Sequence, residues 1–243
     1  GHALLVTASL DTAVRIWDPF TAEQVALLAS HRHSVKSLTV SPDGSIVAAG
    51  HHDGMVVLWD TTTGTELVRL EGARADVVAL SFRPDGRTIA TGSRDSSCRL
   101  WDVHTGGLLA TLAHGASVQA TAFSPNGSRI ATGGGRTLRL WDGATGQPVT
   151  RLVGHEQPIR SVAFSPDGSL LVSADLSGTV RAWDGITGAA RWVLKRHRGA
   201  VAAIAFSPEG SRFASVGLDH VGFLWDVASG THVASLAGHS SWL

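Results

Sequence analysis

Short apolar runs of strand length, each followed by turn residues, recur along the whole chain. Between positions 159 and 194 they cover Ile159 to Phe164, Leu170 to Ser173, Thr179 to Trp183 and Ala190 to Leu194. Runs of this length bounded by turn residues predict β-strands, and we name the four strands of such a unit a, b, c and d. Four antiparallel strands cannot bury both of their faces alone. The units are therefore expected to stack against one another.

Three markers repeat in step with these strands. The dipeptide Trp-Asp occurs at intervals of 42, 42, 40, 42 and 42 residues. Its tryptophans are Trp17, Trp59, Trp101, Trp141, Trp183 and Trp225. Turn sequences such as Ser41-Pro42-Asp43-Gly44 mark five units, because proline presets φ and glycine tolerates a positive φ. A glycine follows each Trp-Asp pair except the first, where Ala22 stands. A period of this length indicates a repeat protein.

The units resemble WD40 repeats, whose signature is a Gly-His near the start and a Trp-Asp near the end. The resemblance covers essentially the whole chain. It implies an all-β fold, a β-propeller of four-stranded antiparallel blades, with strands a to d ordered outward from the axis. We predict a single WD40 domain over residues 1–243, with six units centred on the six motif tryptophans.

Both ends of the chain fall inside a repeat unit. Gly1 fits the glycine that ends the a–b turn, so strand a of the first unit is expected to be missing. Gly238 and His239 begin a further unit. Two explanations stay open: a six-bladed ring that lacks one strand, or part of a longer array, since WD40 propellers commonly close with seven blades. We favour the longer array, within a larger protein.

The resemblance also implies a hydrogen-bonded tetrad of His, Asp, Ser or Thr, and Trp inside each blade. Its physical reason is that a buried indole N–H needs an acceptor. The histidine precedes strand a, the aspartate lies six residues before the tryptophan, and the hydroxyl is expected eight residues before it. In the fourth unit Gly135 takes the aspartate position, and in the fifth Asp175 is displaced by two. The predicted structural residues are Ser9, Asp11, Trp17, His31, Asp53, Trp59, Ser93, His197, Asp219 and Trp225.

Serine, histidine and aspartate together could suggest a catalytic triad. The same trio recurs in several units, however, and none of the common hydrolase, zinc-protease or phosphate-loop motifs occurs. We therefore expect no catalytic residue and no cofactor. The histidines His31, His33, His51 and His52 could suggest zinc. We expect no metal site, because His51 and His52 are adjacent at a strand end and point to opposite sides.

Composition adds three constraints. The 20 basic and 20 acidic residues balance, which argues against attraction to nucleic acid or to a membrane surface. No apolar run approaches the length of a membrane span. Cys98 is the only cysteine, so a disulfide within the chain is excluded. We expect Cys98 to be a core residue and the protein to be cytoplasmic. Trp192 lies outside the motif and is expected either to pack between blades or to form an exposed anchor.

These features predict a non-catalytic scaffold or sensor for protein–protein interaction. The alternatives are an enzyme with an active site at the central channel, and a nucleic-acid-binding propeller. In an up-and-down blade the d–a and b–c connections share one face, and their sequences vary between units. Arginine and histidine gather there, and arginine suits bidentate binding of carboxylates. We predict that an acidic peptide or protein segment binds at Arg32, His33, His52, Arg74 and Arg94, near Asp76.

Overall fold

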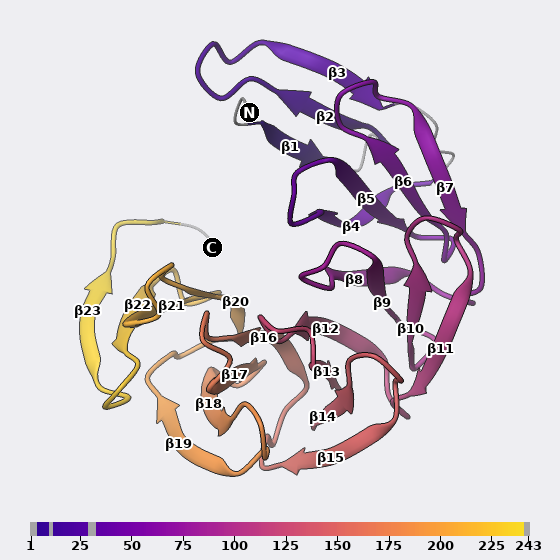
Figure 1. Cartoon of the computed structure of the whole chain (residues 1–243). Coiled ribbons are helices and arrows are strands. Elements are labelled where there is room, and N and C mark those ends of the chain that lie inside the picture. Colours follow the sequence, from indigo (N-terminus) through magenta and orange to yellow (C-terminus); the bar gives the residue numbers. More distant parts are fainter. Residues whose placement is uncertain (1–3, 10–11, 29–32, 241–243) are drawn as a thin grey trace. The chain divides into compact units, whose positions relative to one another are not determined.

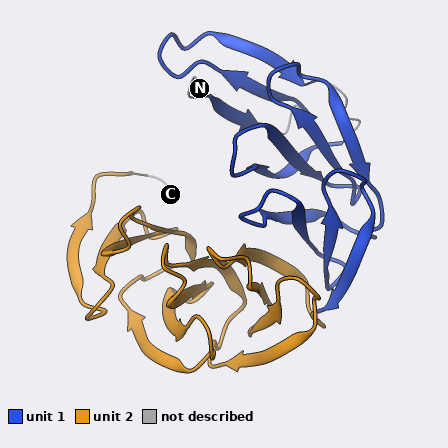
Figure 2. Ribbon diagram, in the orientation of Figure 1, with its two compact units in different colours: residues 1–113 blue, residues 114–243 orange. Residues whose placement is uncertain are grey.

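The structure, a computed structural model, describes residues 4–9, 12–28 and 33–240. Every regular element in these ranges is a β-strand (Figure 1). The strands belong to two compact units, residues 1–113 and 114–243, which Figure 2 distinguishes by colour. None of the described ranges contains a helix of the length and apolar character that spanning a membrane requires.

Unit 1 contains three antiparallel sheets, which we call blades 1 to 3. Blade 1 has β1 (Leu5–Ala8), β2 (Val14–Trp17) and β3 (Gln24–Leu28). Blade 2 has β4 (Val35–Val40), β5 (Ile46–His51), β6 (Val56–Asp60) and β7 (Glu66–Leu70). Blade 3 has β8 (Val77–Phe82), β9 (Thr88–Ser93), β10 (Ser97–Asp102) and β11 (Leu108–Ala113).

Unit 2 contains blades 4 to 6, each with four strands. Blade 4 has β12 (Val118–Phe123), β13 (Arg129–Gly134), β14 (Thr137–Asp142) and β15 (Pro148–Val153). Blade 5 has β16 (Ile159–Phe164), β17 (Leu170–Asp175), β18 (Thr179–Asp184) and β19 (Ala190–Lys195). Blade 6 has β20 (Val201–Phe206), β21 (Arg212–Gly217), β22 (Gly222–Asp226) and β23 (His232–Leu236).

Each blade joins strands that are consecutive in the sequence, and every pairing is antiparallel. This topology confirms the predicted all-β fold of four-stranded antiparallel blades. The three described strands of blade 1 correspond to b, c and d of the repeat. Burial follows strand position: β9 and β17 are buried at every residue, whereas β11 and β15 alternate between exposed and covered positions. In blades 2 to 5 the second strand is therefore core, and the fourth is largely exposed to solvent.

The turn residues explain two of the sequence markers. In the Ser-Pro-Asp-Gly turn, Ser41 Oγ donates to Asp43 and accepts the backbone N–H of Ile46, while Gly44 adopts a φ of +77°. In the turn after the motif tryptophan, Asp102 Oδ1 accepts the backbone N–H and the hydroxyl of Thr105. Aspartate follows the tryptophan because its carboxylate closes this turn through local hydrogen bonds.

Four of the motif tryptophans, Trp59, Trp101, Trp183 and Trp225, pack in the apolar layers between neighbouring blades of a unit. Trp101 packs with Leu58 and Leu70 of blade 2, and Trp225 packs with Val180 of blade 5. Five of the six motif tryptophans are buried. Trp17 is only half-buried, and its sheet, blade 1, is the first sheet in the described residues.

Replacement of Gly54 tests how closely the connections within unit 1 approach one another. Its φ is +89°, and a Cβ there would lie 2.4 Å from the carbonyl oxygen of Ala73. Gly86 has a φ of +70° with nothing within 4 Å of the added atom, so it provides the matched control. We expect Gly86→Ala to lower the free energy of unfolding by about 1 kcal/mol, the cost of the left-handed backbone. Gly54→Ala should cost clearly more in the same urea titration, and equal losses would contradict this packing.

Candidate functional site

Blade 6 contains a complete buried hydrogen-bonded network. His197 Nδ1 lies 3.0 Å from Asp219 Oδ1, and its Nε2 lies 2.8 Å from Ser215 Oγ. Ser215 Oγ in turn accepts the indole N–H of Trp225 at 2.9 Å. Burial raises the pKa of Asp219, but the hydrogen bonds from His197 and from the backbone of Arg198 outweigh it and lower the pKa overall. A carboxylate only accepts, so Nδ1 carries the proton and Nε2 accepts from the serine.

Blade 5 builds the same network from a displaced carboxylate. His155 Nδ1 lies 2.7 Å from Asp175 Oδ2, and Nε2 lies 2.7 Å from Ser173 Oγ, which accepts the Trp183 indole N–H. The side chains of His155 and Asp175 are each 1% exposed. Burial lowers the pKa of His155 despite its carboxylate partner. Asp175 thus serves the network from two residues earlier than in blade 6, a role that the spacing rule did not assign.

Blade 4 has no carboxylate at this place and turns its histidine over. His114 Nδ1 lies 2.9 Å from Thr132 Oγ1, and Nε2 lies 3.1 Å from the carbonyl oxygen of Gly134. A carbonyl only accepts, so here Nε2 carries the proton. An added Cβ at Gly134 would lie 2.8 Å from the His114 ring, so glycine permits this close approach. The histidine therefore keeps two partners although Gly135 replaces the aspartate.

The predicted position of the hydroxyl is wrong. The acceptor of the indole N–H lies ten residues before the tryptophan, or nine in blade 4, rather than eight. The observed pairs are Thr7 with Trp17, Thr91 with Trp101, Thr132 with Trp141, Ser173 with Trp183, and Ser215 with Trp225. Ser9 and Ser93 are therefore not the acceptors; Ser93 Oγ donates to the carbonyl of Ala75 instead. The positions eight and ten residues before the tryptophan share one face of strand b, because they are two residues apart. The indole N–H contacts the one in mid-strand.

Blades 2 and 3 carry only parts of the network. Ala49 stands ten residues before Trp59, so this position offers no hydroxyl in blade 2. Asp53 Oδ2 lies 3.7 Å from His33 Nε2 at the surface. In blade 3 burial raises the pKa of Asp95, but its hydrogen bonds, including those from the Arg74 backbone and the Arg99 guanidinium, outweigh burial and bring it to about 2. The predicted residues Asp11, His31 and Arg32 lie outside the described residues.

The network hydroxyls lie in the core. Ser173 and Ser215 are fully buried, and each already accepts an indole N–H. A nucleophile must reach its substrate beside an oxyanion hole. These serine, histidine and aspartate side chains therefore stabilise the blades, and their geometry offers no route to a substrate.

Two exposed basic side chains of unit 1 contact one carboxylate, and a third, Arg74, lies two residues before it in the chain. We call His52, Arg74 and Arg94 the basic surface of unit 1; they lie on the connections after β5, β7 and β9. His52 Nδ1 lies 3.0 Å from Asp76 Oδ1, and Arg94 contacts Asp76 Oδ2 at 3.3 Å. Burial raises the pKa of Asp76, but His52 and Arg94 outweigh it and lower the pKa overall. The buried Asp76 thus holds two of the predicted residues together.

The histidines of blade 2 diverge. His51 is buried and its Nδ1 lies 3.4 Å from the carbonyl oxygen of His33, whereas His52 turns outward to Asp76. Among the described residues, no three His, Cys, Asp or Glu side chains lie close enough together to hold a metal ion. Cys98 is fully buried, and burial raises its pKa to about 12. Trp192 is partly buried and stacks on Phe213 with ring centroids 5.7 Å apart.

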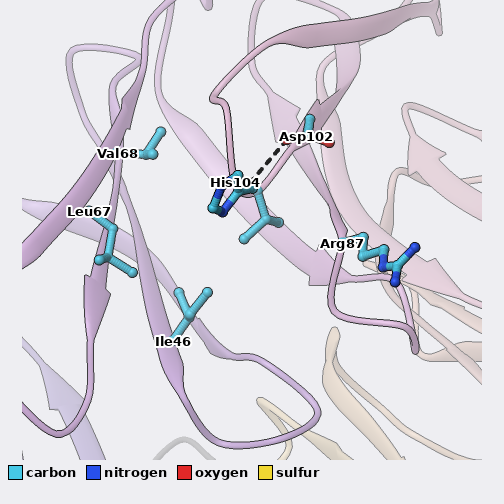
Figure 3. A pocket seen from close by; sticks show the side chains of 7 residues that line it. Ile46, Leu67, Val68, Arg87, Asp102 and His104 are labelled. Carbon is cyan, nitrogen blue, oxygen red and sulfur yellow. Dashed lines mark hydrogen bonds between the residues drawn. The ribbon is translucent and has the colours of Figure 1, made fainter.

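Sequence reasoning missed a groove in unit 1. It has a volume of about 550 Å³ and lies between blades 2 and 3. Figure 3 shows Ile46, Leu67 and Val68 on one side and His104 facing them, with Arg87 at the far side. The backbone N–H of His104 donates to Asp102, which fixes the turn that carries it. Arg87 replaces a serine that stands at this position in four other units, and that departure from the repeat was the available signal.

Removal of the Asp219 carboxylate tests the blade 6 network. We expect Asp219→Ala to lower the free energy of unfolding by roughly 1–3 kcal/mol, because the His197 ring and the Arg198 N–H lose a buried acceptor. Asp219→Asn, which retains one acceptor oxygen, should lose less. Denaturant titration followed by tryptophan fluorescence measures both variants. An alanine variant as stable as the parent would contradict the structural role.

The pH dependence of stability follows from the buried histidines. Burial holds the pKa of His114 and His155 below the ordinary value of 6.5. Near pH 6.5 these histidines therefore bind protons in the unfolded chain but not in the folded chain. The neutral histidines contribute their full stability above pH 6.5, and this contribution is lost as the pH falls through their lower folded pKa. The free energy of unfolding should decrease between about pH 7 and pH 5. Replacement of both histidines by glutamine should give a shallower decrease, and an unchanged slope would refute this assignment.

The family model of the WD domain, G-beta repeat, matches residues 22–60, 64–102, 106–142, 146–184 and 188–226. Each matched segment ends on the aspartate of a Trp-Asp pair and spans the last strand of one blade and the first three of the next. No curated protein matches the chain. Repeats of this class generally serve as non-catalytic scaffolds for protein–protein interaction. The matched segments cover most of the sequence, and the chain therefore belongs to the WD40 repeat family.

Proposed function

We propose that this domain is an interaction scaffold or sensor whose basic surface of unit 1 binds an acidic segment of a partner protein. The observation that carries the proposal is the exposure of His52 and Arg94 around the Asp76 carboxylate, with the exposed Arg74 on the connection that leads to Asp76. The side chains of His52 and Arg94 remain 62% and 53% exposed although both contact Asp76. Their remaining donors face solvent and are free to meet carboxylates.

The connections that carry these side chains are held by backbone hydrogen bonds. The backbone N–H of His52 donates to Ser34, that of Arg94 donates to Asp76, and that of Arg74 donates to the Asp95 carboxylate. Because the loops are fixed before binding, little ordering entropy opposes association. Loops positioned by a rigid scaffold are a common place for binding residues.

Local charge supports an acidic partner although the whole chain is neutral. His33 contacts Asp53, and Arg99 forms an ion pair with Asp95. Asp76 is therefore the carboxylate that contacts both His52 and Arg94. Arg74 makes no side-chain hydrogen bond or ion pair within the described part of the chain. Arginine binds carboxylates in a bidentate manner, so Arg74 and Arg94 offer the strongest contacts to glutamate or aspartate side chains.

Charge reversal tests this proposal. A fluorescent oligoglutamate peptide should bind the wild-type protein more weakly as salt increases. Arg74→Glu combined with Arg94→Glu should reduce the affinity roughly tenfold. Arg136→Glu combined with Arg151→Glu, two exposed positions of unit 2 with the same change in net charge, provides the control. Equal losses in the two double variants, measured by fluorescence anisotropy, would show a nonspecific charge effect and refute the site.

A further inference from the structure

A second groove, in unit 2, combines three cations with an apolar floor. It has a volume of about 560 Å³ and lies between the end of β19 and blade 6. Ser235 and Ala237 complete its wall. We call it the basic groove of unit 2, and its defining residues are Lys195, Arg196, Arg198, Asp219, Val221 and Phe223. None of these residues belongs to the basic surface of unit 1.

The cations of this groove are not neutralised within it. Lys195, Arg196 and Arg198 are exposed, and no ion pair engages their charged groups within the described part of the chain. The one acid in the lining, Asp219, accepts hydrogen bonds from the buried His197 and from the backbone N–H of Arg198. Three positive charges and one negative charge leave the groove with a net charge of about +2.

The groove exists because two positions of the repeat carry different residues in blade 6 and the connection before it. At the place of Arg196, the preceding unit has Gly154. In blade 5 the guanidinium of Arg181 lies over the Trp183 ring, and a Cβ on Gly154 would lie 2.7 Å from it. Blade 6 has Phe223 at the position of Arg181, which leaves room for a side chain on the preceding connection.

Arg196 uses that room and places its guanidinium over the Phe223 ring, 5.3 Å from the centroid. A stacked guanidinium keeps the N–H donors of its edge free for an anion, and stacking fixes its orientation before binding. The neighbouring Lys195 and Arg198 add donors on the same connection, and Val221 adds apolar surface beside Phe223. The groove thus presents oriented, exposed donors beside an apolar floor.

We propose that the basic groove of unit 2 binds a phosphorylated side chain within a segment of a partner protein. A phosphoserine carries a charge of about −1.5 to −2 and three acceptor oxygens, which match the net charge and the donors of the groove. A carboxylate carries only a single negative charge and two acceptor oxygens. The volume exceeds the need of a phosphate alone and lies within the range of about 300–1,000 Å³ that ligand pockets occupy, so flanking residues can contact Val221 and Phe223. The proposal rests on the scaffold function but uses none of the residues of unit 1.

Three peptide libraries provide the test, with random flanks around a fixed central phosphoserine, serine or glutamate. Binding to the intact chain is measured by fluorescence anisotropy. The phosphoserine library should bind at least about tenfold more tightly than the glutamate library. Lys195→Ala combined with Arg198→Ala should remove this preference, because both side chains are exposed and contribute only charge. Thermal unfolding verifies that the double variant remains folded.

The controls separate this site from the basic surface of unit 1. Arg74→Glu combined with Arg94→Glu should leave the phosphoserine preference unchanged, whatever it does to oligoglutamate binding. Equal binding of the glutamate and phosphoserine libraries would overturn the proposal, as would binding that survives loss of Lys195 and Arg198. Inorganic phosphate is the competitor: if it binds as tightly as the phosphoserine library, the groove is a site for free phosphate and the proposal fails.

Discussion

The blades depend on one constraint, the need of a buried indole N–H for an acceptor. Five of the six motif tryptophans are buried, and a buried indole N–H left without a partner would be costly. A mid-strand hydroxyl on strand b meets this need in five of the six blades, as in the Thr91 and Trp101 pair. In blades 4 to 6 the hydroxyl in turn engages a histidine from the connection before strand a. In these blades one series of hydrogen bonds therefore links strand b, strand c and the connection before strand a.

The sequence predicted the blades accurately because their constraints are local and repeated. Strand length, turn glycines and the Trp-Asp period all recur, and the strands of blade 5 begin at the predicted residues Ile159, Leu170, Thr179 and Ala190. The details of the networks were harder. Spacing placed the hydroxyl at Ser93 rather than Thr91, because positions eight and ten residues before the tryptophan face the same side of the strand. They differ only in which of them the indole N–H of the tryptophan can reach.

The candidate surfaces depend on contacts between segments that no spacing rule connects. Sequence placed His52 and Arg94 on one face, but their shared carboxylate, Asp76, is a feature of the folded connections. The basic groove of unit 2 was missed for a related reason. The exchange of Arg181 and Gly154 in one blade for Phe223 and Arg196 in the next becomes meaningful only when the ring and the guanidinium are seen to stack. Positions where a unit departs from the repeat identify candidate surfaces, whereas the repeated positions identify the core.

The single cysteine gives the protein an internal reporter. Cys98 lies in β10 with no exposed surface, and burial raises its pKa to about 12, so in the folded blade it presents neither access nor a thiolate to a reagent. Its rate of alkylation therefore measures how often blade 3 opens. Because no second thiol exists in the chain, that signal comes from unit 1 alone. The local opening of unit 1 can thus be timed without any substitution in the chain.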